Sequence, residues 1–151
     1  MKKLTEIEIK KMIAVAQEAR ENAFVIRSLH QFGACVITEE GELFGGCNIE
    51  NTISGMGVCA ERAAIDNAVV HGKYRFRGIA IVDDSEVLVY PCGVCREYLA
   101  LFSQTNDIDL EVILAKSETK YVVKKISKLL PNMFVSKSET TRNKIKSYKN
   151  K

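Results

Sequence analysis

Cys59-Ala60-Glu61-Arg62 and Pro91-Cys92-Gly93-Val94-Cys95-Arg96 are the two stretches that decide how this chain of 151 residues is interpreted. Together they hold three of its five cysteines. A structural zinc site closes its shell with four protein ligands, whereas a hydrolytic site keeps three and leaves the fourth position to water. We therefore predict one hydrolytic Zn²⁺ per subunit, with the ligands Cys59, Cys92 and Cys95.

The acidic residue of the first motif completes this chemistry. Glu61 lies two residues after Cys59, too close for both to ligate one ion but close enough for the carboxylate to reach a metal-bound water. A carboxylate so placed takes a proton from the water and passes it on, and we predict this proton-shuttle role for Glu61. The alternative is a structural site whose fourth ligand is His30 or His71. That alternative is disfavoured because a structural finger would more naturally use two Cys-x-x-Cys motifs.

Both motifs stand where helices are expected to begin, at 59–70 and 92–102. The first turn of a helix offers unpaired N–H groups and the positive end of the helix dipole, which favour thiolate over thiol. Three thiolates give the site an excess of negative charge. We predict that Arg62 and Arg96, each directly after a ligand motif, hydrogen-bond the sulfurs from outside the ligand shell.

The rest of the chain alternates between helical and strand-like patterns. A helix is predicted at 4–24, strands at 32–38, 42–47, 76–82, 110–115 and 120–123, and a short helix at 126–130. The first two strands, joined by Glu39-Glu40-Gly41, form a β-hairpin, and the later alternation implies parallel crossovers. We predict an α/β fold, a three-layer α/β/α sandwich around a mixed sheet of about five strands.

Composition fits one compact domain with a charged extension. The chain is 46% hydrophobic, and at this length it buries about two thirds of the surface of the unfolded chain. We divide it into a domain at 1–135 and a basic tail at 136–151, which we expect to be flexible. The tail has six Lys or Arg against one Glu, so the formal net charge of +3 leaves the body at about −2. Such a body disfavours a nucleic-acid-binding surface.

The remaining cysteines and the lack of a long apolar run bear on location. Five cysteines in an unsecreted chain argue against a disulfide framework, and Cys35 and Cys47 are interpreted as small buried hydrophobic residues. No stretch approaches the roughly 20 apolar residues that span a bilayer. We expect a soluble, cytoplasmic protein with no membrane partner.

Five short blocks follow one another between 32 and 134. They are Phe32-Gly33-Ala34, Gly46-Cys47-Asn48-Ile49-Glu50-Asn51, Cys59-Ala60-Glu61-Arg62, Pro91-Cys92-Gly93-Val94-Cys95-Arg96 and Leu129-Leu130-Pro131-Asn132-Met133-Phe134. In this order they resemble the small, homotetrameric, zinc-dependent cytidine deaminases. The resemblance implies a cytidine deaminase-like fold, a cytosine nucleoside as the small-molecule partner, and a homotetramer with shared active sites.

The resemblance also implies a reaction and a set of roles. Cytidine or deoxycytidine is hydrolysed to uridine or deoxyuridine and ammonia, with zinc-bound hydroxide attacking C4 while Glu61 moves the protons. Asn48 and Glu50 are implied to hydrogen-bond the sugar, since an amide and a carboxylate together suit a hydroxyl group. The backbone of Ala60 is implied to accept a hydrogen bond from the exocyclic amino group. Phe134 matches an aromatic residue that reaches into a neighbouring subunit's active site.

Two positions depart from the family pattern. His30 stands where members have a phenylalanine that packs against the pyrimidine, with Phe32 in the place of a valine, and Ser54 stands where many members have a tyrosine. An imidazole can stack on a base but adds a titratable edge. The alternative substrate is therefore a modified cytosine nucleoside, either blasticidin-like or substituted at N4 or C5. Retention of Glu50 favours a true sugar hydroxyl.

Two further classes of function are possible for a chain with these motifs. One is editing of cytosine or adenine in a nucleic acid, for which the basic tail gives slight support. The other is an inactive zinc scaffold that serves as an interaction protein. Glu61 disfavours the scaffold, because a purely structural site needs no unliganded acid beside its metal.

Overall fold

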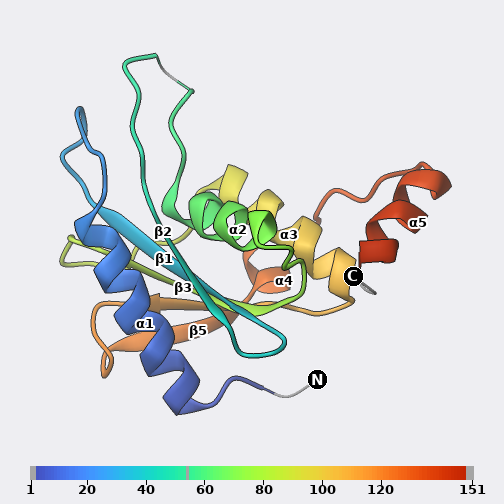
Figure 1. Cartoon of the computed structure of the whole chain (residues 1–151), viewed down its shortest axis with the longest axis horizontal. Helices are drawn as coiled ribbons and strands as arrows, with labels where there is room; N and C mark the ends of the chain where they lie inside the picture. Colours follow the sequence, from blue (N-terminus) through green and yellow to red (C-terminus); the bar gives the residue numbers. More distant parts are fainter. Residues whose placement is uncertain (1–2, 54, 149–151) are drawn as a thin grey trace.

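The computed structural model describes residues 3–53 and 55–148, and Ser54 lies outside this described part. The elements are α1 (Glu6–Glu21), β1 (Phe32–Thr38), β2 (Leu43–Cys47), α2 (Ala60–Val70), β3 (Phe76–Asp83), α3 (Gly93–Asn106), β4 (Glu111–Ala115), β5 (Tyr121–Lys125), α4 (Ile126–Leu129) and α5 (Glu139–Ser147), as Figure 1 shows. The helices and strands predicted between 4 and 130 are confirmed to within a few residues at each end. α5 was not predicted.

The five strands form one mixed sheet in the order β2-β1-β3-β4-β5. β3 and β4 run parallel, whereas the β1–β2, β1–β3 and β4–β5 pairs are antiparallel. α1 packs on one face of the sheet, and α2 and α3 pack on the other (Figure 1). The predicted α/β/α sandwich is confirmed. Parallel pairing is limited to β3 and β4 because α3 is the crossover between them, while a short turn joins β4 to β5.

The side chains of β1 alternate between the two layers. Ala34 and Val36 belong to the apolar cluster beneath α2 and α3, whereas Cys35 and Ile37 belong to the cluster beneath α1. This is the period of two that a pleated strand imposes. Phe32 packs against the same cluster as Ala34. The even-numbered residues of β1 therefore face the layer of α2 and α3.

α1 begins at a capping box and packs closely on β1. The Glu8 N–H donates to the Thr5 hydroxyl at 3.2 Å, and the Thr5 N–H donates to the Glu8 carboxylate at 2.8 Å. Gly33 permits the close approach, because a Cβ atom there would lie 1.9 Å from a main-chain oxygen of α1.

α1 ends at Glu21, three residues before the predicted end. The Phe24 N–H donates to the Asn48 carbonyl at 3.0 Å, and the Glu50 N–H donates to the Phe24 carbonyl at 2.8 Å. These bonds take the Phe24 backbone out of the helix and join it to the segment after β2. The loops that follow α1 and β2 consequently project side by side from the same end of the sheet (Figure 1).

α2 and α3 both begin at this end of the sheet. A Cβ atom at Gly46 would lie 2.2 Å from the Ala64 nitrogen, so the glycine lets α2 lie directly on β2. Cys59 is the N-cap residue of α2, and Cys92 is the N-cap residue of α3. The loop to α3 leaves the carboxyl end of β3, the edge at which open α/β sheets bind ligands. The two cysteine motifs are therefore brought to one place.

Residues 136–148 form more structure than the sequence predicted. The Ser138 hydroxyl caps α5 by accepting the Thr141 N–H at 3.3 Å, and the rings of Tyr74 and Tyr148 meet edge to face at 5.0 Å. No residue of α5 is buried. The division at residue 135 and the flexibility of the tail stay predictions. Within the described part of the chain, no helix has the length and apolar character required to cross a membrane.

Candidate active site and metal centre

Three sulfur atoms converge at the starts of α2 and α3. The Sγ atoms of Cys59, Cys92 and Cys95 all lie within 4.8 Å of one another. No histidine or carboxylate among the described residues joins this group. The structure thus brings together the three ligands that the two motifs predicted.

The two histidines considered as a fourth ligand lie elsewhere. His30 Nδ1 is 3.3 Å from Asp84 Oδ1, and His71 Nδ1 is 2.7 Å from the Asn67 carbonyl oxygen. The structure therefore offers three protein ligands within the described residues, which is the number that leaves a position open for a reactant.

Helix geometry favours ionised sulfurs in this cluster. Cys59 and Cys92 occupy N-cap positions, and the Cys95 N–H donates to Cys92 Sγ at 3.4 Å. Hydrogen bonds from the Cys95 thiol and from Arg62 lower the pKa of the Cys59 thiol. Donation to Cys59, together with burial, raises the pKa of Cys95. These hydrogen bonds favour the thiolate form of Cys59.

The sulfur cluster fits Zn²⁺. Sulfurs in a tetrahedral site with Zn–S bonds of about 2.3 Å are roughly 3.8 Å apart, and the three sulfurs here, all within 4.8 Å of one another, are close to that separation. The Arg62 Nε atom is buried without a hydrogen-bond partner among the described residues. A thiolate-rich centre supplies the negative charge that such a buried guanidinium needs.

Glu61 lies in the first turn of α2, beside the sulfurs. Glu61 is 6% exposed. Burial is the main cause that raises the pKa of its carboxyl group, and the charge of Cys59 adds to the effect. Glu61 lines the same pocket as Cys59 and Cys92. A carboxyl group with a raised pKa next to an open metal position is suited to accept and release protons.

The two arginines after the motifs lie in different places. Arg62 donates from Nη2 to the Gly57 carbonyl at 3.0 Å, and its guanidinium contributes to the lowered pKa of the Cys59 thiol. Arg96 donates from Nε to the Pro91 carbonyl at 2.8 Å and from Nη1 to the Leu129 carbonyl at 3.1 Å. Arg62 therefore acts electrostatically on the ligand set, whereas Arg96 fixes the main chain that presents Cys92.

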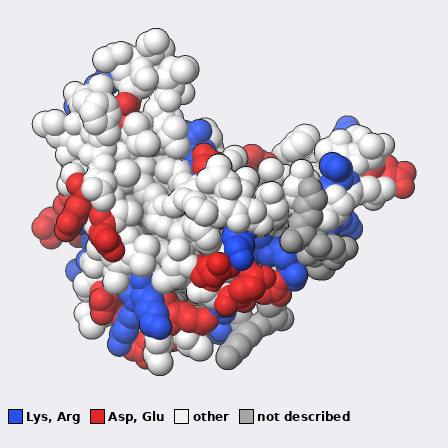
Figure 2. All heavy atoms as spheres, viewed as in Figure 1, with Lys and Arg blue, Asp and Glu red and all other residues white. Residues whose placement is uncertain are grey.

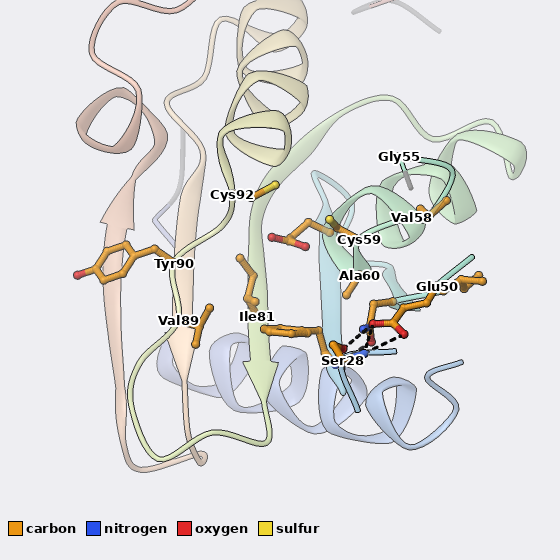
Figure 3. Close-up of a pocket in the computed structure, with 15 residues that line it drawn as sticks. Ser28, Glu50, Gly55, Val58, Cys59, Ala60, Ile81, Val89, Tyr90 and Cys92 are labelled. Carbon is orange, nitrogen blue, oxygen red and sulfur yellow. Dashed lines mark hydrogen bonds between the residues drawn. The ribbon is translucent and has the colours of Figure 1, made fainter. Parts of the chain in front are cut away.

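A pocket of about 390 Å³ opens beside the cluster. Its lining residues are Ser28, Phe32, Asn48, Ile49, Glu50, Gly55, Gly57, Val58, Cys59, Ala60, Glu61, Ile81, Val89, Tyr90 and Cys92. Figure 3 shows the two ends of this pocket, with Cys59 and Cys92 at one end and Ser28 facing Glu50 at the other. We call these the metal end and the loop end. A volume of this size accommodates a small molecule.

Asn48 is buried at the loop end, where its side chain joins two segments. Its Oδ1 accepts the Phe32 N–H at 2.8 Å, and its Nδ2 donates to the His30 carbonyl at 2.9 Å. An amide has two donor hydrogens and two acceptor lone pairs. One donor and one acceptor position of Asn48 therefore remain for a ligand.

Glu50 binds the loop that follows α1. Its Oε2 accepts the main-chain N–H groups of Ile26 at 2.7 Å and Arg27 at 2.6 Å, and its Oε1 accepts both the Ser28 N–H and the Ser28 hydroxyl. The Ser28 hydroxyl, followed by these main-chain donors, lowers the pKa of Glu50 to about 2. The carboxylate is ionised at neutral pH and shapes the wall of the pocket.

The remaining predicted residues divide between the pocket and the outer surface. Ala60 lines the pocket between the two ends (Figure 3). The imidazole of His30 is 64% exposed and pairs with Asp84, and Phe134 is 70% exposed on the surface near α3. Neither His30 nor Phe134 is among the residues that line the pocket of a single chain.

Among the lining residues that the sequence analysis did not assign to the site are Ser28, Phe32, Ile81 and Tyr90. Ser28 reaches Glu50 across 22 residues, and Ile81 is an ordinary apolar residue of a buried strand. Only Tyr90, directly before the second motif, carried a local signal. The fold and the site together define a zinc-dependent hydrolytic centre of the nucleobase deaminase class.

Comparisons with known proteins identify the family. Residues 6–108 match the cytidine and deoxycytidylate deaminase zinc-binding region. A cytidine deaminase from Sporosarcina psychrophila is 38% identical over 128 residues, which cover 85% of this chain and 92% of that protein. A probable cytidine deaminase from Dictyostelium discoideum is 33% identical over 132 residues, covering 87% and 86%.

A solved structure agrees with the sequence matches. The crystal structure of cytidine deaminase from Burkholderia pseudomallei superposes with a TM-score of 0.75 at 34% identity, covering 82% of this chain and 97% of that one. The chain therefore belongs to the zinc-binding cytidine and deoxycytidylate deaminase family.

Proposed function

We propose that this protein hydrolyses cytidine or deoxycytidine to uridine or deoxyuridine and ammonia. The observation that carries the proposal is the convergence of three sulfurs within 4.8 Å at a pocket that Glu61 also lines. Family membership supports the same reaction. The pocket volume of about 390 Å³ suits a free nucleoside.

The metal end performs the chemistry. Cys59, Cys92 and Cys95 would hold zinc, which would acidify a water molecule so that it can act as a nucleophile at neutral pH. Glu61 takes the proton of that water and delivers it to N3 of the cytosine ring. The water oxygen bonds to C4, and Glu61 then carries the remaining proton of that oxygen to the amino group at C4. The C4–N bond breaks, ammonia leaves, and the oxygen from water stays on C4.

The middle and the loop end hold the substrate. The carbonyl oxygen of Ala60 accepts a hydrogen bond from the exocyclic amino group, and the free donor and acceptor of Asn48 bind a sugar hydroxyl. Glu50 already accepts hydrogen bonds on both oxygens. A sugar hydroxyl reaches this carboxylate by taking the place of the Ser28 hydroxyl, which is free to rotate.

The proposal includes a homotetramer in which Phe134 enters the pocket of a neighbouring subunit. Apolar side chains exposed on the projecting loops support such an assembly: Phe24 at 58%, Leu29 at 74%, Ile53 at 65% and Met56 at 62%. A dilution series tests this, because activity should fall as the assembly dissociates. Activity that persists in the monomer would contradict a shared site.

A nucleic-acid substrate has less support. On the face shown in Figure 2, positive and negative side chains are interspersed over the lower half, and mostly uncharged side chains cover the projecting loops. The Lys and Arg side chains on this face form no continuous basic track, and such a track is what a polymer phosphate backbone requires. We therefore propose a free nucleoside as the partner, met in the cytoplasm.

An ultraviolet-monitored screen with zinc-loaded protein tests the function. Cytidine and deoxycytidine should be converted with the absorbance change of uracil formation, while single-stranded DNA and RNA should stay unchanged. Preference for an N4- or C5-substituted cytosine nucleoside would establish the alternative substrate. A zinc-loaded protein that converts none of these would indicate an inactive scaffold.

A further inference from the structure

Two aromatic side chains line the pocket among the described residues, Phe32 and Tyr90. Figure 3 shows the Tyr90 ring pointing away from the cysteines and from Ser28, and this residue is 44% exposed. Phe32, by contrast, packs against the apolar cluster beneath α2 and α3. Phe32 is therefore the aromatic residue available inside the pocket.

The register of β1 fixes the direction in which Phe32 faces. Phe32 begins the strand, two residues before Ala34, and so shares its face. Ala34 pairs with Ile81 on β3. Ile81 lines the pocket as well. Because alternate residues of a strand share a face, Phe32 and Ile81 lie on the side of the sheet where α2 presents Cys59 and Glu61.

Asn48 holds the main chain of Phe32 on both sides. The Phe32 N–H donates to Asn48 Oδ1 at 2.8 Å, and the Asn48 N–H donates to the Phe32 carbonyl at 3.2 Å. Asn48, which keeps a free donor and a free acceptor for the sugar, thus also fixes the main chain that carries the Phe32 ring. Sugar and base positions are coupled through this pair.

His30 does not share this geometry. β1 begins only at Phe32, so the alternation of the strand does not extend back to His30. The imidazole of His30 pairs with Asp84, and the Gln31 N–H donates to the other Asp84 oxygen at 3.1 Å. These contacts join the loop before β1 to the loop after β3, outside the pocket.

We propose that Phe32 supplies the ring against which the cytosine base packs, while the His30 imidazole stays outside the pocket, paired with Asp84. This inference rests on the proposed function, since it requires a cytosine nucleoside in the pocket. Stacking acts on the base in the ground state and the transition state alike. Loss of the ring therefore raises KM more than it lowers kcat.

Three zinc-loaded variants test the proposal with cytidine and deoxycytidine. Phe32→Leu should raise KM by about tenfold for both substrates, and raise the inhibition constant of uridine by a similar factor, with kcat changed by less than about threefold. Phe32→Tyr, which keeps the ring, and His30→Ala should each leave KM within about threefold of the wild-type value. An equal rise in KM for cytidine and deoxycytidine would show that Phe32 acts on the base and not on the sugar.

The opposite pattern overturns the proposal: an unchanged KM for Phe32→Leu, or a tenfold rise for His30→Ala. Zinc content and thermal midpoint are measured on each variant. A merely structural role of Phe32 would lower both and leave KM unchanged, which also counts against the proposal. Failure of the wild-type protein to convert any cytosine nucleoside would refute the proposed function itself. An active wild type together with an unchanged KM in Phe32→Leu would refute this inference alone.

Discussion

The two ends of the pocket are built in different ways. At the metal end, Cys59, Glu61, Cys92 and Cys95 lie at the starts of two helices, and each pair is two or three residues apart in sequence. At the loop end, Glu50 is held by main-chain groups 22 to 24 residues away. The metal end depends on local helix geometry, and the loop end depends on tertiary contacts between loops.

This difference teaches where chemistry and selectivity are encoded. A helix N-terminus fixes a thiolate and a nearby carboxylate with little help from the rest of the chain. The shape of the loop end depends on hydrogen bonds between the two loops. A substitution in either loop therefore changes that shape. We therefore expect substitutions at the metal end to remove the reaction, and substitutions at the loop end to alter substrate affinity.

The largest effect is expected from removal of a ligand. Cys92→Ala leaves two sulfurs, which cannot hold zinc firmly, so zinc content should fall from about one ion per chain to near zero and activity to background. Atomic absorption and the cytidine assay measure both. Cys47→Ser is the matched control, since this half-buried cysteine lies outside the cluster and its replacement should keep the metal. Full activity in Cys92→Ala would contradict the three-sulfur centre.

Removal of the proton shuttle should have the next largest effect. Glu61→Gln keeps the size of the side chain but cannot accept a proton, so kcat should fall by about 10²–10⁴-fold while zinc is retained. Glu97→Gln, at an exposed position on α3, is the control and should behave as the wild type. An unaltered kcat in Glu61→Gln would assign proton transfer to another group.

Sequence patterns predicted the metal end more fully than the loop end. The spacing of Cys59 and Glu61 in one helical turn and the Cys-x-x-Cys of α3 are local, so the sequence contains their geometry. The wall loop depends on the left-handed Leu29 and on the Glu50 carboxylate, which meets groups distant in sequence. Hydrogen bonds between groups that are distant in sequence leave no periodic pattern in the sequence. The metal ligands could therefore be predicted, whereas the place of His30 could not.

The fold shows the same division. Strand and helix periodicity predicted the sheet, because buried alternation is a property of each segment alone. The end of α1 was predicted three residues late, since Phe24 leaves the helix to pair with the segment at Asn48 and Glu50. α5 was missed because its composition is polar and basic, and its start depends on the Ser138 cap.

A smaller effect is expected from the loop end. Glu50→Gln keeps one acceptor oxygen but loses the charge that attracts the main-chain N–H groups of Ile26 and Arg27, so the wall loop loosens. KM for cytidine should rise on the order of tenfold with kcat less affected. Ser28→Ala is the matched control: it removes one donor to Glu50 and leaves that oxygen free for the sugar, so KM should change less. A larger loss in Ser28→Ala than in Glu50→Gln would show that the hydroxyl itself binds substrate.

The smallest effect on activity is expected far from the pocket, at the ion pair of Glu8 and Arg77. The hydrogen bond from Arg77 is the main cause that lowers the pKa of Glu8 from 4.5 to about 2. A carboxyl group whose pKa is lower in the folded state stabilises the protein above its unfolded pKa, and this stabilisation is lost as the pH falls through the folded pKa. The wild type should therefore lose this contribution between pH 4.5 and about 2.

Glu8→Gln isolates that contribution, because glutamine still serves the capping box with Thr5. Its free energy of unfolding in urea should be about 1–2 kcal/mol below the wild-type value at pH 7, since Arg77 is left buried without its charged partner. The difference should shrink as the pH approaches 2, and kcat and KM at pH 7 should not change. A difference that stays constant with pH would show that the pair acts through packing alone, and altered kinetics would show that α1 is coupled to the pocket through β1.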